Sequence, residues 1–138
     1  MEENCIKRKR IELLPQGTYY KANLHCHTVV SDGKKTAAQI KEMYQKHGYS
    51  IVAFTDHCVY ESHEELNDKD FLALGAYEIN INEAGEDFSG IRVYHLNLYD
   101  MDPEINSQEK KKSICPEMAY EDIGAINDYL GRMEEMGF

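Results

Sequence analysis

Two histidines separated by a single residue, His25 and His27, stand at the end of a predicted strand. Successive side chains of a strand point to opposite faces, so these two imidazoles point the same way and Cys26 points the other way. Two imidazoles on one face can bind one metal ion. We therefore interpret the pair as metal ligands, and Cys26 as a small buried packing residue.

Four more side chains of the same chemical kinds follow, on predicted strands or shortly after them. They are Asp32, His57, Glu78 and His95. Imidazoles mixed with carboxylates suit zinc, manganese or iron, whereas calcium prefers oxygen ligands alone. The six candidates exceed what one tetrahedral ion takes, so we expect a cluster of two or three ions. Glu78 is the obvious carboxylate to bridge them.

Such a cluster predicts hydrolysis, most naturally of a phosphate ester. Metal ions about 3.5–4 Å apart activate a shared water and stabilise the attacking and leaving oxygens of an in-line displacement. Some of these residues also have a purely structural interpretation. An Asp before Gly, as at Asp32, is ordinary in turns, and Glu78 or His95 could be solvent-facing strand residues. Asp56 could orient a ligand histidine by accepting a hydrogen bond from it, without binding metal itself. His47 and His63 we interpret as surface residues.

The elements that would position these residues alternate between strand and helix patterns. We expect strands over residues 19–25, 51–55, 71–81 and 91–99. Thr36 and Gln39 form a capping-box pattern for a helix that runs to about Lys46, and Gly48 is a natural stop. A final amphipathic helix has an apolar face, formed by Ala119, Ile123, Ile126, Leu130 and Met133. Alternating units of this kind imply a parallel sheet or barrel.

Several of these segments resemble the motifs of the polymerase-and-histidinol-phosphatase (PHP) family of metal-dependent phosphoesterases. The matching segments are Asn23–Thr28, Ser31–Gly33, Phe54–His57, Gly75–Ile79 and Tyr94–Leu98. The resemblance spans about residues 19–99. It implies a distorted seven-stranded β/α barrel that holds up to three zinc, manganese or iron ions and hydrolyses a phosphate ester with metal-activated water.

Carried over motif by motif, the resemblance makes all six candidates metal ligands, with Glu78 as the bridge. These ligands are His25, His27, Asp32, His57, Glu78 and His95. Four of them, His25, His27, His57 and Glu78, we also assign to catalysis.

The family pattern has further ligands on later strands, whereas residues 96–138 contain no histidine. We therefore expect an α/β fold that is the N-terminal portion of a distorted (β/α)7 PHP-type barrel, incomplete at the C-terminus. Residues 1–18 would form an N-terminal arm or edge segment, and residues 19–138 a partial PHP-type domain. An unfinished sheet leaves an open edge, so we expect a homo-oligomer. Two alternatives stay open: a non-catalytic metal-binding or interaction module, and, ranked lower, an amidohydrolase-type metal hydrolase.

The resemblance implies a small phosphorylated substrate or a nucleotide, and the length of the chain suits one domain. The chain has 138 residues and a net charge of −10, which argues against nucleic acid and anionic membranes as partners. No apolar run approaches the length of a membrane span. The four cysteines contain no C-x-x-C pair, so we expect no disulfide framework and a cytoplasmic protein.

Overall fold

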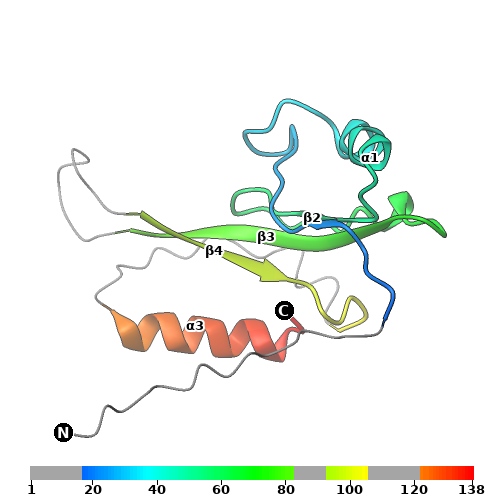
Figure 1. The fold of residues 1–138 in the computed structure, drawn as a ribbon. Coiled ribbons are helices and arrows are strands. Elements are labelled where there is room, and N and C mark those ends of the chain that lie inside the picture. The colour runs from blue at the N-terminus through cyan, green and yellow to red at the C-terminus, as the bar shows by residue number, and fades with distance from the viewer. Residues whose placement is uncertain (1–16, 83–92, 106–121) are drawn as a thin grey trace, which may run out of the picture.

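The computed structural model describes residues 17–82, 93–105 and 122–138 (Figure 1). Most of the expected arm, residues 1–16, and Ala119 of the expected final helix lie outside these ranges. In chain order the elements are β1 (Ala22–Asn23), α1 (Ala37–Lys46), β2 (Ile51–Phe54), the 3-10 helix η1 (Glu64–Leu66), β3 (Leu72–Asn82), β4 (Val93–Tyr99) and α3 (Ile123–Glu135).

The strands form one four-stranded sheet in the order β1-β2-β3-β4. The first two pairings are parallel: Ala22 lies opposite Ile51, and Ile51 in turn lies opposite Leu72. The last pairing, between β3 and β4, is antiparallel and places Glu78 opposite Asn97. The described sheet is therefore mixed rather than purely parallel.

The expectation of a (β/α)7 barrel portion is wrong. Such a barrel has only parallel strands, each followed by a helix. Here β4 runs against β3, and the connection from β2 to β3 contains the short η1 in place of an α-helix. The described residues form a small mixed α/β fold with two α-helices. The apolar pattern of a strand records which side chains are buried but not the direction of the strand, so the sequence could not show this reversal.

Two hydrophobic clusters hold the helices to the sheet, and Figure 1 shows α1 and α3 on opposite sides of it. The cluster beside α1 contains Ala37, Ile40, Val52, Phe54, Phe71 and Ala73. The cluster beside α3 contains Tyr60, Tyr77, Ile79, Tyr129 and Met133. Each helix thus packs through one apolar face, which is the usual way in which a sheet and its helices bury a shared core.

The first helix has the predicted ends. Thr36 Oγ1 accepts a hydrogen bond from Gln39 N at 3.3 Å, and Gln39 Oε1 accepts one from Thr36 N at 3.0 Å. This is the capping box, which satisfies two backbone donors that the first turn leaves without partners. The helix ends at Lys46, and Gly48 follows with a φ of +76°. Only glycine adopts that left-handed conformation at little cost, so both boundary predictions are confirmed.

The last helix exists as predicted, but its buried face is rotated. Met133 is buried, whereas Ile123 is 68% exposed and Leu130 is also exposed. The buried position between them is Tyr129, whose hydroxyl lies 2.6 Å from the hydroxyl of Tyr77 on β3. The apolar pattern did not count tyrosine as a core residue, because its hydroxyl is buried only when another element supplies a hydrogen-bond partner.

Candidate metal centre

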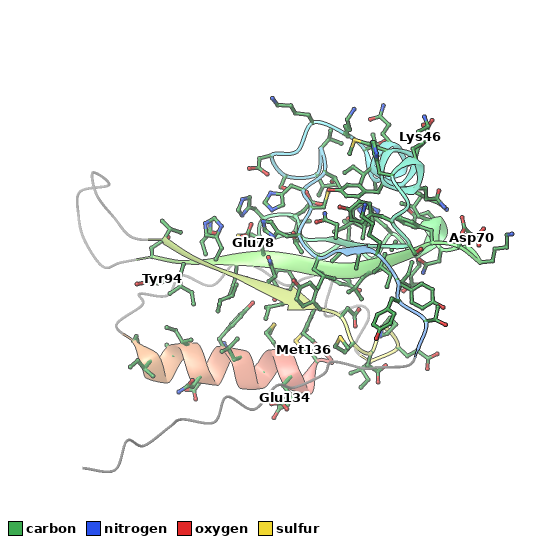
Figure 2. The ribbon with its side chains drawn as sticks, in the orientation of Figure 1. Lys46, Asp70, Glu78, Tyr94, Glu134 and Met136 are labelled. Atoms are coloured by element: carbon green, nitrogen blue, oxygen red, sulfur yellow. The ribbon has the colours of Figure 1, made fainter. Side chains whose placement is uncertain are left out.

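Glu78 lies on β3 (Figure 2), and only 2% of its side chain is exposed. Its carboxylate lies within 4 Å of four of the other predicted ligands. Its Oε1 lies 2.7 Å from His95 Nδ1 and 3.8 Å from His25 Nε2. Its Oε2 lies 3.0 Å from His27 Nε2 and 3.2 Å from His57 Nδ1. Each oxygen of one buried carboxylate therefore faces two histidine nitrogens.

Three of these buried atoms have no hydrogen-bond partner: His27 Nε2, His57 Nδ1 and Glu78 Oε2. Both histidine nitrogens lie 3.0–3.2 Å from Glu78 Oε2, but neither forms a hydrogen bond with it. Burying polar atoms in this state is costly unless another group satisfies them. With metal–ligand bonds of about 2.1 Å, two atoms that bind the same ion lie roughly 3.0–3.4 Å apart. The separations of 3.0 and 3.2 Å from Glu78 Oε2 fit that spacing. Two donor sets have ligand atoms within 4.8 Å of one another, His25, His27 and Glu78 in one and His27, Asp32 and His57 in the other, and such imidazoles and carboxylates suit a zinc, manganese or iron ion.

Asp32 contacts two of the histidines from the solvent side. Its Oδ1 accepts a hydrogen bond from His27 Nδ1 at 2.6 Å, and its Oδ2 lies 3.7 Å from His57 Nε2. The hydrogen bond from His27 lowers the pKa of the Asp32 carboxyl below its ordinary value. A proton held on Nδ1 leaves Nε2 of His27 bare and turned toward Glu78. The sequence predicted Asp32 as a direct ligand; the structure also places it where a carboxylate orients a ligand histidine.

The segment that carries the first two histidines is not the long strand that the sequence predicted. The ladder of β1 covers only Ala22–Asn23, so His25 and His27 lie beyond it. The chain is held there by Thr55, the residue that follows β2: Thr55 N donates to Cys26 O at 2.8 Å, and Cys26 N donates to Thr55 Oγ1 at 3.1 Å. The Thr55 hydroxyl thus takes the place of the backbone carbonyl that would accept from Cys26 N in a regular strand pairing. Cys26 packs against the core cluster beside α1, as predicted, and burial raises the pKa of its thiol.

Asp56 shapes the turn between His27 and Asp32 rather than orienting a histidine. Its Oδ1 accepts hydrogen bonds from Thr28 N at 2.8 Å, Ser31 N at 3.1 Å and Ser31 Oγ at 2.6 Å. Its Oδ2 accepts one from Thr28 Oγ1 at 2.9 Å. A buried carboxylate with four donors is well satisfied without a cation. This network fixes where the Ser31-Asp32-Gly33 motif lies relative to His57.

Gly33 is required by close packing in that turn. A Cβ at this position would lie 2.3 Å from the carbonyl oxygen of His27, closer than any non-bonded contact allows. Gly33 N also donates to Thr28 O at 2.8 Å. The glycine therefore lets the chain fold back tightly enough for Asp32 to reach His27.

Sequence reasoning missed two contacts of His25. Asn97 and Thr55 both lie beside its Nδ1 atom, at 2.9–3.1 Å for the Asn97 amide and 3.2 Å for Thr55 Oγ1. The signal for Asn97 was present in the sequence, because a residue two positions after His95 lies on the same face of a strand.

Two histidines that were predicted to be surface residues differ in the structure. His47 is exposed at the C-terminus of α1, as predicted. His63 is not a surface residue: its side chain is 14% exposed, and its ring lies 4.8 Å from the ring of Phe54 in an edge-to-face contact. The residue has a φ of +51°, and that turn directs the ring inward.

The two cysteines next to candidate ligand histidines differ in oxidation state. Cys58 is disulfide-bonded, a pairing that the composition did not predict. Cys26 is a free thiol that packs toward the core.

No protein-family model matches this chain, and no curated protein matches it either. Within residues 17–82, 93–105 and 122–138, no helix has both the length and the apolar character needed to cross a membrane.

Proposed function

We propose that this protein is a metal-dependent hydrolase of phosphate esters. The observation that supports the proposal most directly is the position of Glu78. It is a buried carboxylate with two histidine nitrogens beside each oxygen, at 2.7–3.8 Å. A single buried charge surrounded by imidazoles is costly unless cations share the space. A carboxylate placed in this way suits a bridge between two ions.

The residues divide into two halves around Glu78. His27 and His57 face Glu78 Oε2, and His25 and His95 face Glu78 Oε1. The donor sets whose atoms lie within 4.8 Å of one another, and which would each hold an ion, are His25, His27 and Glu78 in one set and His27, Asp32 and His57 in the other. When bound, zinc, manganese or iron ions at such a site activate water and neutralise charge on a phosphoryl group. In the same arrangement Asp32 keeps the His27 ring in place.

Exposure of the two halves suggests how a substrate reaches the site. The side chains of His25 and His95 are 50% and 46% exposed, whereas those of His27 and His57 are 17% and 26% exposed. A small phosphate ester from solution would therefore meet the His25–His95 half first. The chain is acidic, with a net charge of −10, but bound cations reverse the local sign and make an anionic substrate acceptable.

The choice of a phosphate ester among hydrolysable substrates rests on the motifs. The segments from Asn23–Thr28 to Tyr94–Leu98 resemble those of PHP phosphoesterases, and all six residues that the resemblance nominates lie together around Glu78 and Asp32.

The test is metal content by elemental mass spectrometry together with hydrolysis of a chromogenic phosphomonoester and phosphodiester. The wild-type protein is compared with the double variant His27→Ala/His57→Ala and with the control His47→Ala, which removes an exposed histidine away from the cluster. We expect bound metal and turnover in the wild type and the control, and neither in the double variant. Metal without turnover would favour the non-catalytic metal-binding module, and cleavage of cyclic amides alone would favour the amidohydrolase alternative.

Self-association stays a prediction. The strand order makes β1 and β4 the edge strands of the described sheet, and exposed backbone at such an edge can pair with a second copy. Light scattering would measure the mass in solution, and a monomeric mass at working concentration would contradict the prediction.

A further inference from the structure

We infer that Asn97 is a positioning residue, which holds His25 in the one tautomer that can bind a metal ion through Nε2. The inference rests on the proposed function, because it takes His25 to be a metal ligand. It adds a residue that none of the chemistry-bearing motifs in the sequence nominated.

The contacts of His25 place its two ring nitrogens in different surroundings. Its Nε2 faces Glu78 Oε1 at 3.8 Å. Its Nδ1 lies 3.1 Å from Asn97 Oδ1, 2.9 Å from Asn97 Nδ2 and 3.2 Å from Thr55 Oγ1. One nitrogen is thus directed into the cluster, and the other is in contact with the side chains that flank it.

The proton of a neutral imidazole sits on one nitrogen, and the hydrogen bond made by the other nitrogen decides which. Binding a metal through Nε2 requires the proton on Nδ1, where it must be donated to an acceptor. Asn97 Oδ1 is such an acceptor. The amide nitrogen lies slightly closer to Nδ1, at 2.9 Å against 3.1 Å for Oδ1, so the two assignments of the Asn97 amide predict opposite tautomers of His25. With Nδ2 as the donor, Nδ1 would be bare and the proton on Nε2 would block the ligand position, which is the outcome that the inference excludes.

Thr55 Oγ1 is a poorer acceptor than Asn97 Oδ1 for a proton on His25 Nδ1. Its hydroxyl oxygen already accepts from Cys26 N at 3.1 Å and lies 3.4 Å from Cys26 O, so its orientation is set by the backbone of the neighbouring segment. The Asn97 side chain comes from β4 and is opposite Glu78 in the register. β4 therefore contributes two residues to the His25–His95 half of the site: His95 as a proposed ligand, and Asn97 as the residue that contacts His25 Nδ1.

His25 is the histidine for which such support matters most. Its side chain is 50% exposed, so packing restricts the ring less than it restricts His27, which is 17% exposed and bonded to Asp32. We expect the loss of the Asn97 contact to affect the His25–His95 half and to leave the His27–His57 half unchanged.

The experiment compares wild type with Asn97→Leu, which removes the hydrogen bond at similar volume, and Asn97→Asp, which keeps an acceptor and has no donor. Asn82→Leu is the matched control, because Asn82 is an exposed asparagine on β3. NMR of isotope-labelled histidine side chains in the metal-free protein, at about pH 8 where an ordinary imidazole is neutral, reports the tautomer. Titration with zinc or manganese reports the affinity of each ion.

We expect wild type, Asn97→Asp and Asn82→Leu to carry the His25 proton on Nδ1, and Asn97→Leu to shift it toward Nε2. The affinity for one ion should fall about 10–100-fold in Asn97→Leu, with the other ion unaffected. An Nε2 proton in the wild type, or an unchanged tautomer in Asn97→Leu, would overturn the inference. If the wild type binds no metal, the proposed function fails, and the tautomer measurement alone decides the role of Asn97. Should Asn97→Leu not fold, a shift to Nε2 in Asn97→Asp would overturn the inference.

Discussion

His95 Nδ1 lies 2.7 Å from Glu78 Oε1, although the strands that carry the two residues run in opposite directions. The register pairs Glu78 with Asn97 and Asn80 with His95, so the contact is diagonal across the antiparallel pair. Diagonal neighbours on one face of a sheet are within reach of long side chains. The cluster thus spans a parallel pair and an antiparallel pair, and half of it depends on how β4 docks against β3.

Replacing Glu78 with glutamine should remove metal and leave the metal-free protein at least as stable. The amide keeps the shape but loses the negative charge that both halves of the cluster share, so metal content should fall by about one ion or more per chain. In chelator-treated protein the substitution removes a buried charge, which should raise the unfolding free energy or leave it unchanged. Elemental analysis and urea unfolding measure the two effects.

The matched control for this variant is Glu104→Gln, which changes an exposed glutamate outside the cluster. Its metal content should equal that of the wild type. Full metal retention in Glu78→Gln would contradict the role of Glu78 as the shared ligand.

Replacing Asp56 with asparagine should destabilise the fold by about 2–3 kcal/mol. The carboxylate accepts four hydrogen bonds from Thr28 and Ser31, and an amide group turns one acceptor into a donor that faces other donors. Urea unfolding measures the loss. The exposed control Asp70→Asn should change the unfolding free energy by less than about 0.5 kcal/mol. Equal stabilities of the two variants would show that the turn does not depend on Asp56.

Replacing Tyr129 with phenylalanine should cost about 1 kcal/mol and leave metal binding intact. The hydroxyl of Tyr129 lies 2.6 Å from that of Tyr77, which also donates to Met133 Sδ at 3.0 Å. The contact anchors α3 on the side of the sheet away from α1 (Figure 1). Thermal unfolding and metal content measure both parts. Tyr20→Phe, at an exposed tyrosine, should have no effect on either.

Stability should fall at alkaline pH because of two buried tyrosines. Burial, aided by hydrogen bonds to Asp100 and Tyr77 respectively, raises the pKa of Tyr60 and Tyr129 above the ordinary value. A pKa that is higher in the folded than in the unfolded state contributes stability that is fully present below about pH 10 and is lost as the pH rises beyond it.

Urea unfolding at about pH 8 and about pH 11 tests this dependence. Tyr60→Phe and Tyr129→Phe should each reduce the loss of unfolding free energy between the two pH values, whereas the exposed control Tyr20→Phe should not. An identical loss in all four proteins would show that the buried hydroxyls do not contribute to it.

The local features of this chain follow from its sequence. The capping box at Thr36 and the glycine stop at Gly48 depend on residues a few positions apart, and the structure confirms both. The strands over residues 51–54, 72–82 and 93–99 have apolar patterns that predicted them. The six candidate ligands were nominated by residue type and spacing, and they lie together around Glu78 and Asp32.

Only the tertiary structure decided how these pieces meet. The direction of β4 is absent from its sequence pattern, because alternation of side chains reads the same in parallel and antiparallel pairs. The buried face of α3 contains Tyr129 because that residue packs against β3 and its hydroxyl meets the hydroxyl of Tyr77, a residue far away in the chain. The contact of Asn97 with His25 likewise exists only because β4 lies beside β3. Local backbone preferences depend on near neighbours in sequence, whereas burial and side-chain pairing depend on neighbours in space.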